Sequence, residues 1–168
     1  NISRFILTSV SEVKTIKKQP KVKTLADKWI LSEFNEMIDE VSKDLDNFKF
    51  SSAGEKLYHF TWDDLADWYL EIAKIEKDKD EILLYILERL LIICHPFTPF
   101  VTENIWKYFD KENLLMVADW PKVGKVDKDT IINFAELKEL VVNLRNLKAA
   151  NKIPPTDFPD CNLVSAIL

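Results

Sequence analysis

Apolar residues recur at spacings of three and four along most of the chain, the period of an amphipathic α-helix. The clearest case lies between Thr24 and about residue 47. Its apolar stripe is formed by Leu31, Phe34, Ile38, Val41, Leu45 and Phe48. Thr24, followed three residues later by Asp27, predicts a capping box at the start of this helix.

The same pattern predicts a series of long helices. They cover residues 24–47, 51–76, 79–94, 99–109 and 129–150. Ser51 or Ser52, with Glu55, should cap the second helix, and Thr98 followed by Pro99 should cap the fourth. The third is apolar almost all round, as in a helix surrounded by others. With only two glycines in the chain, the predicted fold class is all-α, an antiparallel helix bundle.

The chain opens on a further helical pattern. Ile2, Phe5 and Ile6 form an apolar stripe, whereas Asn1 and Arg4 lie on the opposite face. Neither Met nor a capping residue precedes this helix, so we expect the chain to be part of a longer protein.

The domain organisation follows from these elements. We expect residues 1–150 to form one helical domain and residues 151–168, which contain three prolines, to form the extended start of a C-terminal region. No run approaches the roughly 18 apolar residues of a membrane span, and no secretion signal opens the chain. The cytoplasm is therefore the expected compartment.

The charge is unevenly distributed. The chain carries a net charge of −5, yet residues 1–28 hold seven Lys or Arg against two acids. The lysines are Lys14, Lys17, Lys18, Lys21, Lys23 and Lys28. Such a patch attracts phosphates through counterion release. Charge alone favours the simpler alternative, a solvated linker.

Catalytic signatures are missing from the sequence. The only glycines, Gly54 and Gly124, stand alone, so no glycine-rich phosphate cradle is present. The two cysteines, Cys94 and Cys161, form no spacing motif. With only His59 and His95 besides them, the soft ligands are too few for a plausible zinc site. Neither histidine belongs to a triad signature, and the paired acids are typical of solvent-exposed helix faces. We therefore expect no catalysis, cofactor or metal in this chain.

The aromatic residues of the second helix are candidates for RNA contact. On a wheel of about 100° per residue, the apolar face centres near Leu65 and Ile72, with Tyr58 and Tyr69 close by. Trp68 falls at the margin, and Phe60 farther out among acids. A marginal Trp can stack on an unpaired base, worth about 1 to 3 kcal/mol, although a Trp at the border of a bundle is more often part of the core.

Several segments resemble the valyl-tRNA synthetase family, a class I aminoacyl-tRNA synthetase family, in its order and spacing. They are residues 1–5 (Asn-Ile-Ser-Arg-Phe), 25–32, 62–74, 95–106 (His-Pro-Phe-Thr-Pro-Phe-Val-Thr-Glu-Asn-Ile-Trp), 144–148 and 153–155. The leucine and isoleucine enzymes usually carry Ala-Pro in place of His95-Pro96, so this pair favours valine.

The resemblance implies an anticodon-binding helix bundle of the class I type. It also implies that the complete enzyme ligates valine to its tRNA with ATP and magnesium, in a catalytic domain of the same parent chain. The nucleotide-binding signatures of that domain are absent here. The expected partners are therefore a valine-specific tRNA and the catalytic domain, without a membrane, and the chain is expected to be a monomer.

The resemblance also selects candidate site residues. Related methionine-specific enzymes recognise the anticodon with an Asn and an Arg on the corresponding first helix and a Trp on another. The matching candidates here are Asn1, Arg4 and Trp68, while Lys21 and Lys23 would contact phosphates. A helical protein-interaction domain, the equivalent domain of an isoleucyl- or leucyl-tRNA synthetase, and a free-standing helical enzyme remain as alternatives.

Overall fold

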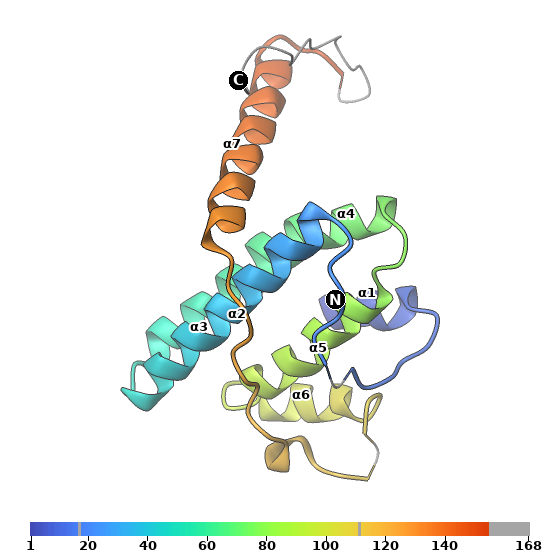
Figure 1. Ribbon diagram of the computed structural model, residues 1–168, viewed down its shortest axis with the longest axis vertical. Helices are drawn as coiled ribbons and strands as arrows, with labels where there is room; N and C mark the ends of the chain where they lie inside the picture. Colours follow the sequence, from blue (N-terminus) through green and yellow to red (C-terminus); the bar gives the residue numbers. More distant parts are fainter. Residues whose placement is uncertain (17, 111, 155–168) are drawn as a thin grey trace. The chain divides into compact units, whose positions relative to one another are not determined.

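A computed structural model describes residues 1–16, 18–110 and 112–154, and within these ranges the chain is helical, without strands (Figure 1). The elements are α1 (Ile2–Ser9), α2 (Leu25–Asp46), α3 (Phe50–His59), the π-helix η1 (Phe60–Tyr69), α4 (Leu70–Ile75), α5 (Asp80–Cys94), α6 (Pro99–Trp106), the 3₁₀ turn η2 (Leu115–Val117) and α7 (Lys128–Ala150). The predicted all-α fold class is confirmed.

The capping box at the start of α2 is confirmed. The Asp27 N–H donates to Thr24 Oγ1 at 3.3 Å, and Thr24 N–H donates to Asp27 Oδ2 at 3.1 Å. The predicted stripe is buried as far as Val41. The prediction is wrong for its last member, Phe48, because the helix ends at Asp46. The backbone of Phe48 is left-handed (φ 60°), and 79% of its surface is exposed.

The predicted cap of the second helix is wrong. The helix begins at Phe50, with Lys49 at the N-cap position and no capping side chain. Ser52 cannot serve as the cap, because its hydroxyl donates to Asp44 Oδ2 at 2.7 Å. The serine thus connects the start of α3 to the end of α2.

A π-helix interrupts the second predicted helix. Phe60, Leu65 and Leu70 are all buried although they are five residues apart. Five residues of an α-helix rotate the side chain by about 140° net, so these three would not share a face. In a π-helix, whose hydrogen bonds join residues i and i+5, they do. The change of period buries a face that an α-helical wheel does not show.

Two predictions about aromatic exposure are therefore wrong. Phe60, expected among solvent-facing acids, is 3% exposed, and its ring centroid lies 5.1 Å from that of Phe34 on α2. Tyr58, expected near the apolar centre, is 59% exposed.

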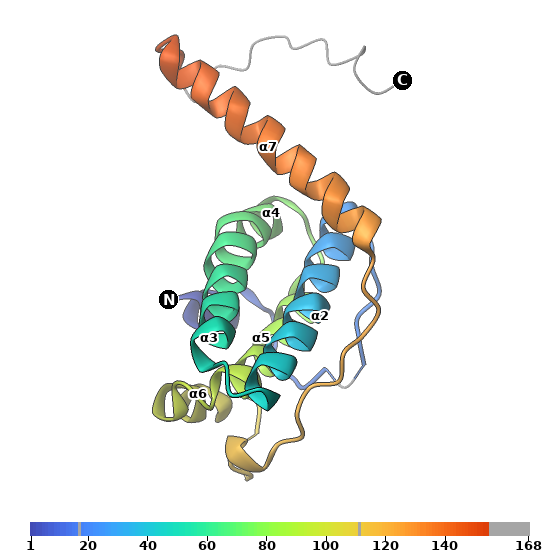
Figure 2. The same cartoon turned by 90° about the vertical axis from the view of Figure 1, so that its left-hand side faces the viewer.

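The core forms around α2 and α5. Figures 1 and 2 show α2 lying alongside the continuous run α3–η1–α4, and α5 packs against α1, α2 and α6. Ten of the fifteen residues of α5 are buried, which confirms the prediction of a helix surrounded by others. Trp29 and Tyr69 are among the largest fully buried side chains.

Side-chain hydrogen bonds connect α6 to the residues before and after it. Thr98 occupies the predicted N-cap position, but its hydroxyl donates to Cys94 O at 3.3 Å instead of capping the helix. His95 Nδ1 lies 2.8 Å from Thr102 Oγ1, and the Glu103 carboxylate accepts from Leu115 N–H at 3.0 Å. The helix ends at residue 106, three residues earlier than predicted.

The chain divides into two compact units, residues 1–131 and residues from 132 onward. The helix predicted over 129–150 is confirmed as α7. Its packing into the bundle and the expected domain boundary at residue 150 stay predictions, and residues 155–168 lie outside the described part of the chain. Among the described helices, none has the length and apolar character needed to cross a membrane.

Candidate nucleic-acid interface

The first helix presents its polar face to solvent. Ile6 is fully buried, and α1 packs against α5, whereas Asn1 and Arg4 are exposed as predicted. Asn1 also lies at the edge of a shallow pocket of about 170 Å³ between α1 and the η1–α4 run. The pocket is lined by Asn1, Ile2, Phe5, Ala66, Leu70, Glu71 and Lys74.

The pocket combines groups that suit a nucleobase. The Lys74 ammonium lies 5.5 Å from the Phe5 ring centroid and 2.5 Å from the Glu71 carboxylate. An aromatic face, a cation and the Asn1 amide are therefore close together. Such groups can stack on a planar ring and hydrogen-bond to its edge.

Trp68 lies near this pocket without lining it. The residue is half-buried in η1, two positions after Ala66, which does line the pocket. The structure thus brings Asn1 close to the helix that carries Trp68.

Tyr58 and Trp62 form an exposed aromatic pair that the sequence did not predict. Trp62 is 46% exposed, and its ring centroid lies 6.3 Å from that of Tyr58. The α-helical wheel placed Tyr58 in the core, so only the three-dimensional structure shows this pair. His59 Nδ1 lies 2.7 Å from Asp63 beside it, which makes this surface partly acidic.

The lysine-rich segment between α1 and α2 is fastened along α5. The Ser11 N–H and hydroxyl both donate to Asp80 Oδ2, at 3.0 and 2.9 Å. Farther on, the Ile16 N–H donates to Glu88 Oε2 at 3.2 Å, and Arg89 Nη2 donates to Ile16 O at 3.0 Å. Burial raises the pKa of Glu88 above its usual range. The segment is therefore held against α5 at Ser11 and Ile16.

Lys21 and Lys23 line a groove of about 780 Å³ beside this segment. Both are exposed, as phosphate-binding lysines must be. The groove also contains acids: Lys23 Nζ lies 3.2 Å from Asp78 Oδ2, and Lys14 Nζ lies 3.9 Å from Glu81 Oε1.

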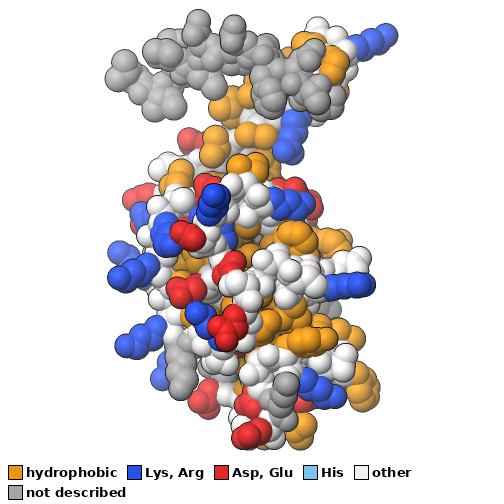
Figure 3. Space-filling model, turned by 90° about the vertical axis from the view of Figure 1, so that its right-hand side faces the viewer, with side chains coloured by type: hydrophobic (Ala, Val, Ile, Leu, Met, Phe, Trp, Pro, Cys, Tyr) orange, Lys and Arg blue, Asp and Glu red, His pale blue; other side chains and the backbone are white. Residues whose placement is uncertain are grey.

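The predicted basic patch is thus partly neutralised by the fold. Lys28 pairs with Asp127 at 2.7 Å and, with Thr130, lowers the pKa of that acid to about 2. Figure 3 shows Lys and Arg side chains interleaved with Asp and Glu on the face that it presents. Lys17, part of the predicted patch, lies outside the described residues.

The structure contains a buried polar network that the sequence did not predict. Asp27 Oδ1 accepts hydrogen bonds from Lys79 Nζ at 2.6 Å and from Tyr69 OH at 2.9 Å. Burial opposes ionisation of Asp27, but its hydrogen bonds from Lys79, the Lys23 N–H and Tyr69 outweigh it, so the pKa of this acid lies below its usual range. Burial and the neighbouring carboxylate raise the pKa of Tyr69. The network joins α2, η1 and the start of α5.

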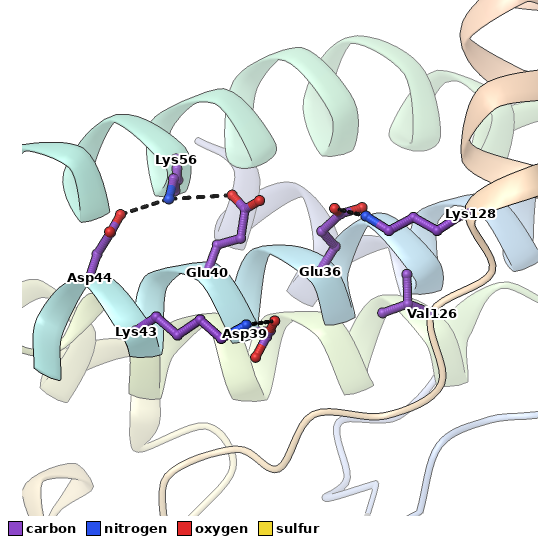
Figure 4. A pocket seen from close by; sticks show the side chains of 8 residues that line it. All are labelled: Glu36, Asp39, Glu40, Lys43, Asp44, Lys56, Val126 and Lys128. Atoms are coloured by element: carbon purple, nitrogen blue, oxygen red, sulfur yellow. Dashed lines mark hydrogen bonds and ion pairs between the residues drawn. The ribbon is translucent and has the colours of Figure 1, made fainter.

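A groove of about 520 Å³ along α2, with Lys56 of α3 in its lining, contains several ion pairs (Figure 4). Lys56 lies 2.7 Å from Asp44 and 3.4 Å from Glu40, and its hydrogen bond holds the pKa of Asp44 below its usual range. The other ion pairs are Lys43 with Asp39 and Lys128 with Glu36. The acids outnumber the lysines here, so this groove does not favour RNA phosphates.

Groups for metal chemistry do not converge in the described part of the chain. No cluster there holds three or more His, Cys, Asp or Glu side chains in positions that could bind a metal ion. Burial raises the pKa of the Cys94 thiol to about 11, so it is protonated at neutral pH.

Comparison with known proteins places these features in a family. Residues 27–159 match the model of the anticodon-binding domain of tRNA ligase. The chain belongs to this family of anticodon-binding domains.

Curated relatives of the chain include several valine–tRNA ligases. The chain is 36% identical over 167 residues to that of Bacillus cereus (strain ATCC 10987 / NRS 248), which covers 92% of the chain and 19% of the ligase. It is 34% identical over 178 residues to that of Carboxydothermus hydrogenoformans, covering 99% of the chain and 20% of the ligase. The chain thus spans about a fifth of the length of these relatives. The resemblance to the valine family is confirmed.

A solved structure supports the fold. The LeuRS–tRNA–LeuAMS ternary complex of Agrobacterium radiobacter K84 matches with a TM-score of 0.54 and 20% identity, over 77% of this chain and 15% of that one. The helical architecture is therefore shared with part of that LeuRS complex.

Proposed function

We propose that this chain is the anticodon-recognition domain of a valine–tRNA ligase and binds the valine-specific tRNA. The observation that carries the proposal is the similarity to valine–tRNA ligases over nearly the whole chain, together with the anticodon-binding family match over residues 27–159. In the complete ligase, ATP and magnesium would serve a catalytic domain on the same polypeptide. That ligase would act in the cytoplasm as a monomer.

The proposed RNA surface has two parts with different tasks. Arg4, beside the pocket at Asn1, can fork two hydrogen bonds to a base edge or a phosphate. Lys21 and Lys23 supply point charges for the sugar–phosphate backbone. Trp68 would stack on a base if bound RNA draws its half-buried ring outward.

The exposed face of α6 supports the proposal that a larger ligase surrounds this domain. Thr102 and Trp106 face inward, whereas Phe100, Val101 and nearby Tyr108 are 90%, 61% and 61% exposed. These side chains form an apolar face beside the exposed Lys107. Another domain of the same ligase would cover it.

The decisive experiment is a binding titration of valine-specific tRNA against the same tRNA with an exchanged anticodon, at several salt concentrations. Phosphate contacts predict a steep fall of affinity with salt, and anticodon recognition predicts a preference for the cognate tRNA. Absence of tRNA binding even at low salt would favour the alternative, a helical protein-interaction domain.

Substitutions separate the two parts of the surface. Arg4→Ala should weaken cognate binding by about 1 to 3 kcal/mol and reduce discrimination between anticodons. Lys21→Ala should weaken all tRNAs equally and flatten the salt dependence. Trp68→Phe, checked by thermal melting, tests stacking without emptying the core. If Arg4→Ala discriminates as well as the parent does, the anticodon site lies elsewhere.

We further propose that the chain alone is not catalytic. The absence of a glycine-rich phosphate site from its sequence motivates this proposal. Valine-dependent exchange of pyrophosphate into ATP by the purified chain would contradict it.

A further inference from the structure

Two lysines of the segment between α1 and α2, Lys14 and Lys23, face acids of the turn that precedes and opens α5. The ion pair of Lys23 with Asp78 spans 3.2 Å, and that of Lys14 with Glu81 spans 3.9 Å. Side-chain exposure is 57% and 74% in the first pair, so water and ions reach both partners. Lys21 lines the same groove.

We propose that the acids of this turn stand in for RNA phosphates and lower the affinity of the lysine segment for RNA of any sequence. The inference rests on the proposed function, since it concerns how RNA binding is divided between parts of the surface. An exposed ion pair contributes little stability, so an incoming phosphate can displace the carboxylate. The displaced acid nevertheless remains beside the phosphate and repels it.

The backbone of the turn keeps the acids in place. Asp78 adopts a left-handed conformation (φ 62°), and the next residue, Lys79, is 3% exposed with its ammonium bound to Asp27 and Glu76 at 2.6 and 2.5 Å. Asp80 is fixed by its two hydrogen bonds from Ser11. Because the turn cannot easily withdraw, RNA binding would retain the repulsion from Asp78.

The consequence concerns specificity. Backbone contacts bind all RNA sequences equally, whereas base contacts separate one sequence from another. Acids that weaken only the backbone contacts leave base recognition at α1 with a larger share of the total affinity. The ratio of cognate to other affinity is unchanged, because both fall equally, but RNA without the cognate bases binds more weakly with Asp78 present than without it.

Asp78→Asn tests the proposal directly. Asparagine tolerates left-handed backbone as readily as aspartate does, so the turn should keep its shape. The variant should bind a 20-mer of uridine about two- to five-fold more tightly at low salt. The slope of log affinity against log salt should steepen by up to about 0.7, the value of one added single-strand phosphate contact.

Asp39→Asn is the matched control. It removes the same charge and frees Lys43 from a 2.6 Å ion pair, but in a different groove, along α2. Equal tightening by Asp39→Asn and Asp78→Asn would mean that net charge alone acts, and the proposal would be wrong. Glu81→Gln, which frees Lys14, should repeat the effect of Asp78→Asn in a weaker form.

A double substitution isolates the lysine that the acid occupies. Lys23→Ala should weaken uridine 20-mer binding in the parent, and weaken it several-fold more in the Asp78→Asn background. Additive effects would overturn the proposal, because they would show that the two side chains act separately. If neither the parent nor Asp78→Asn binds the 20-mer or tRNA at low salt, the proposed function is wrong as well. If the parent binds tRNA but Asp78→Asn binds the 20-mer no more tightly than the parent does, only this inference is wrong.

Discussion

Asp27→Asn changes a buried carboxylate whose two oxygens accept four hydrogen bonds. Oδ1 accepts from Lys79 Nζ at 2.6 Å and Tyr69 OH at 2.9 Å, and Oδ2 accepts from the N–H groups of Lys23 and Thr24 at 3.0 and 3.1 Å. Asparagine offers one oxygen and one amino group. Whichever way its amide turns, the amino group faces donors.

The expected loss follows from burial. Asp27 is 0% exposed and Lys79 3% exposed, so the substitution leaves a buried ammonium with a single carboxylate partner, the partly exposed Glu76. Removing one partner of a buried ion pair costs about 3 to 5 kcal/mol of unfolding free energy. For a chain of this length, that loss corresponds to a fall in Tm of roughly 6 to 20 °C.

Urea and thermal unfolding at pH 7, followed by far-UV circular dichroism, measure the loss. Asp39→Asn is the control, since its exposed i,i+4 pair should contribute only about 0.3 to 0.5 kcal/mol. A loss below about 1 kcal/mol, or one equal to that of the control, would refute the reasoning from burial.

The pH dependence of the same pair of proteins gives an independent check. The folded pKa of Asp27 is lowered, so its stabilising contribution is present above the unfolded pKa of about 3.9 and is lost as pH falls through the folded value. The stability difference between the parent and Asp27→Asn should therefore be full at pH 7 and shrink in acid below about pH 4. A difference that stays constant through that range would show that the lost contacts are not electrostatic.

Three further substitutions test the packing. Phe60→Ala should lower the free energy of unfolding in urea by about 3 to 5 kcal/mol because the π-helix buries this ring; a loss under about 0.5 kcal/mol would indicate an exposed, α-helical register. Gly124→Ala should cost about 1 to 3 kcal/mol in the same assay, since its new Cβ would meet Asn35 Oδ1 at 2.8 Å and break the hydrogen bond from the Gly124 N–H; unchanged stability would mean that the buried amide can move aside. Phe100→Ser should leave stability within about 0.5 kcal/mol of the parent; a large fall in Tm would show that this side chain packs within the domain.

Local sequence signals predicted the local features of the fold. The Thr24 and Asp27 pair marks the first residue of α2 because both halves of a capping box lie within four residues. Ser52 shows why the same reasoning failed one helix later. Its hydroxyl has a competing acceptor, Asp44, brought near by the turn between the helices, and no pattern around Ser52 announces that partner.

The candidate site was predictable in part for the same reason. The polar face of α1, with Asn1 and Arg4 exposed, follows from three-and-four spacing within the helix itself. The charge of the lysine segment does not, because its counter-charges at Asp78 and Glu81 lie more than fifty residues away in sequence. A count of charges along the chain therefore overstated the positive potential available to RNA.

The buried face of the π-helix could not be predicted from the sequence for a different reason. A helical wheel assumes the hydrogen-bond period before it assigns faces, and Phe60, Leu65 and Leu70 match a five-residue period only once that period is known. The altered rotation buries Phe60 and turns Tyr58 and Trp62 outward, since residues before and inside the π-helix no longer share the α-helical phase. The pocket beside Asn1 includes Ala66 from this same stretch. The π-helical register therefore sets which η1 side chains line the pocket beside α1, and a substitution that restored the α-helical period would alter that surface without touching Asn1 or Arg4.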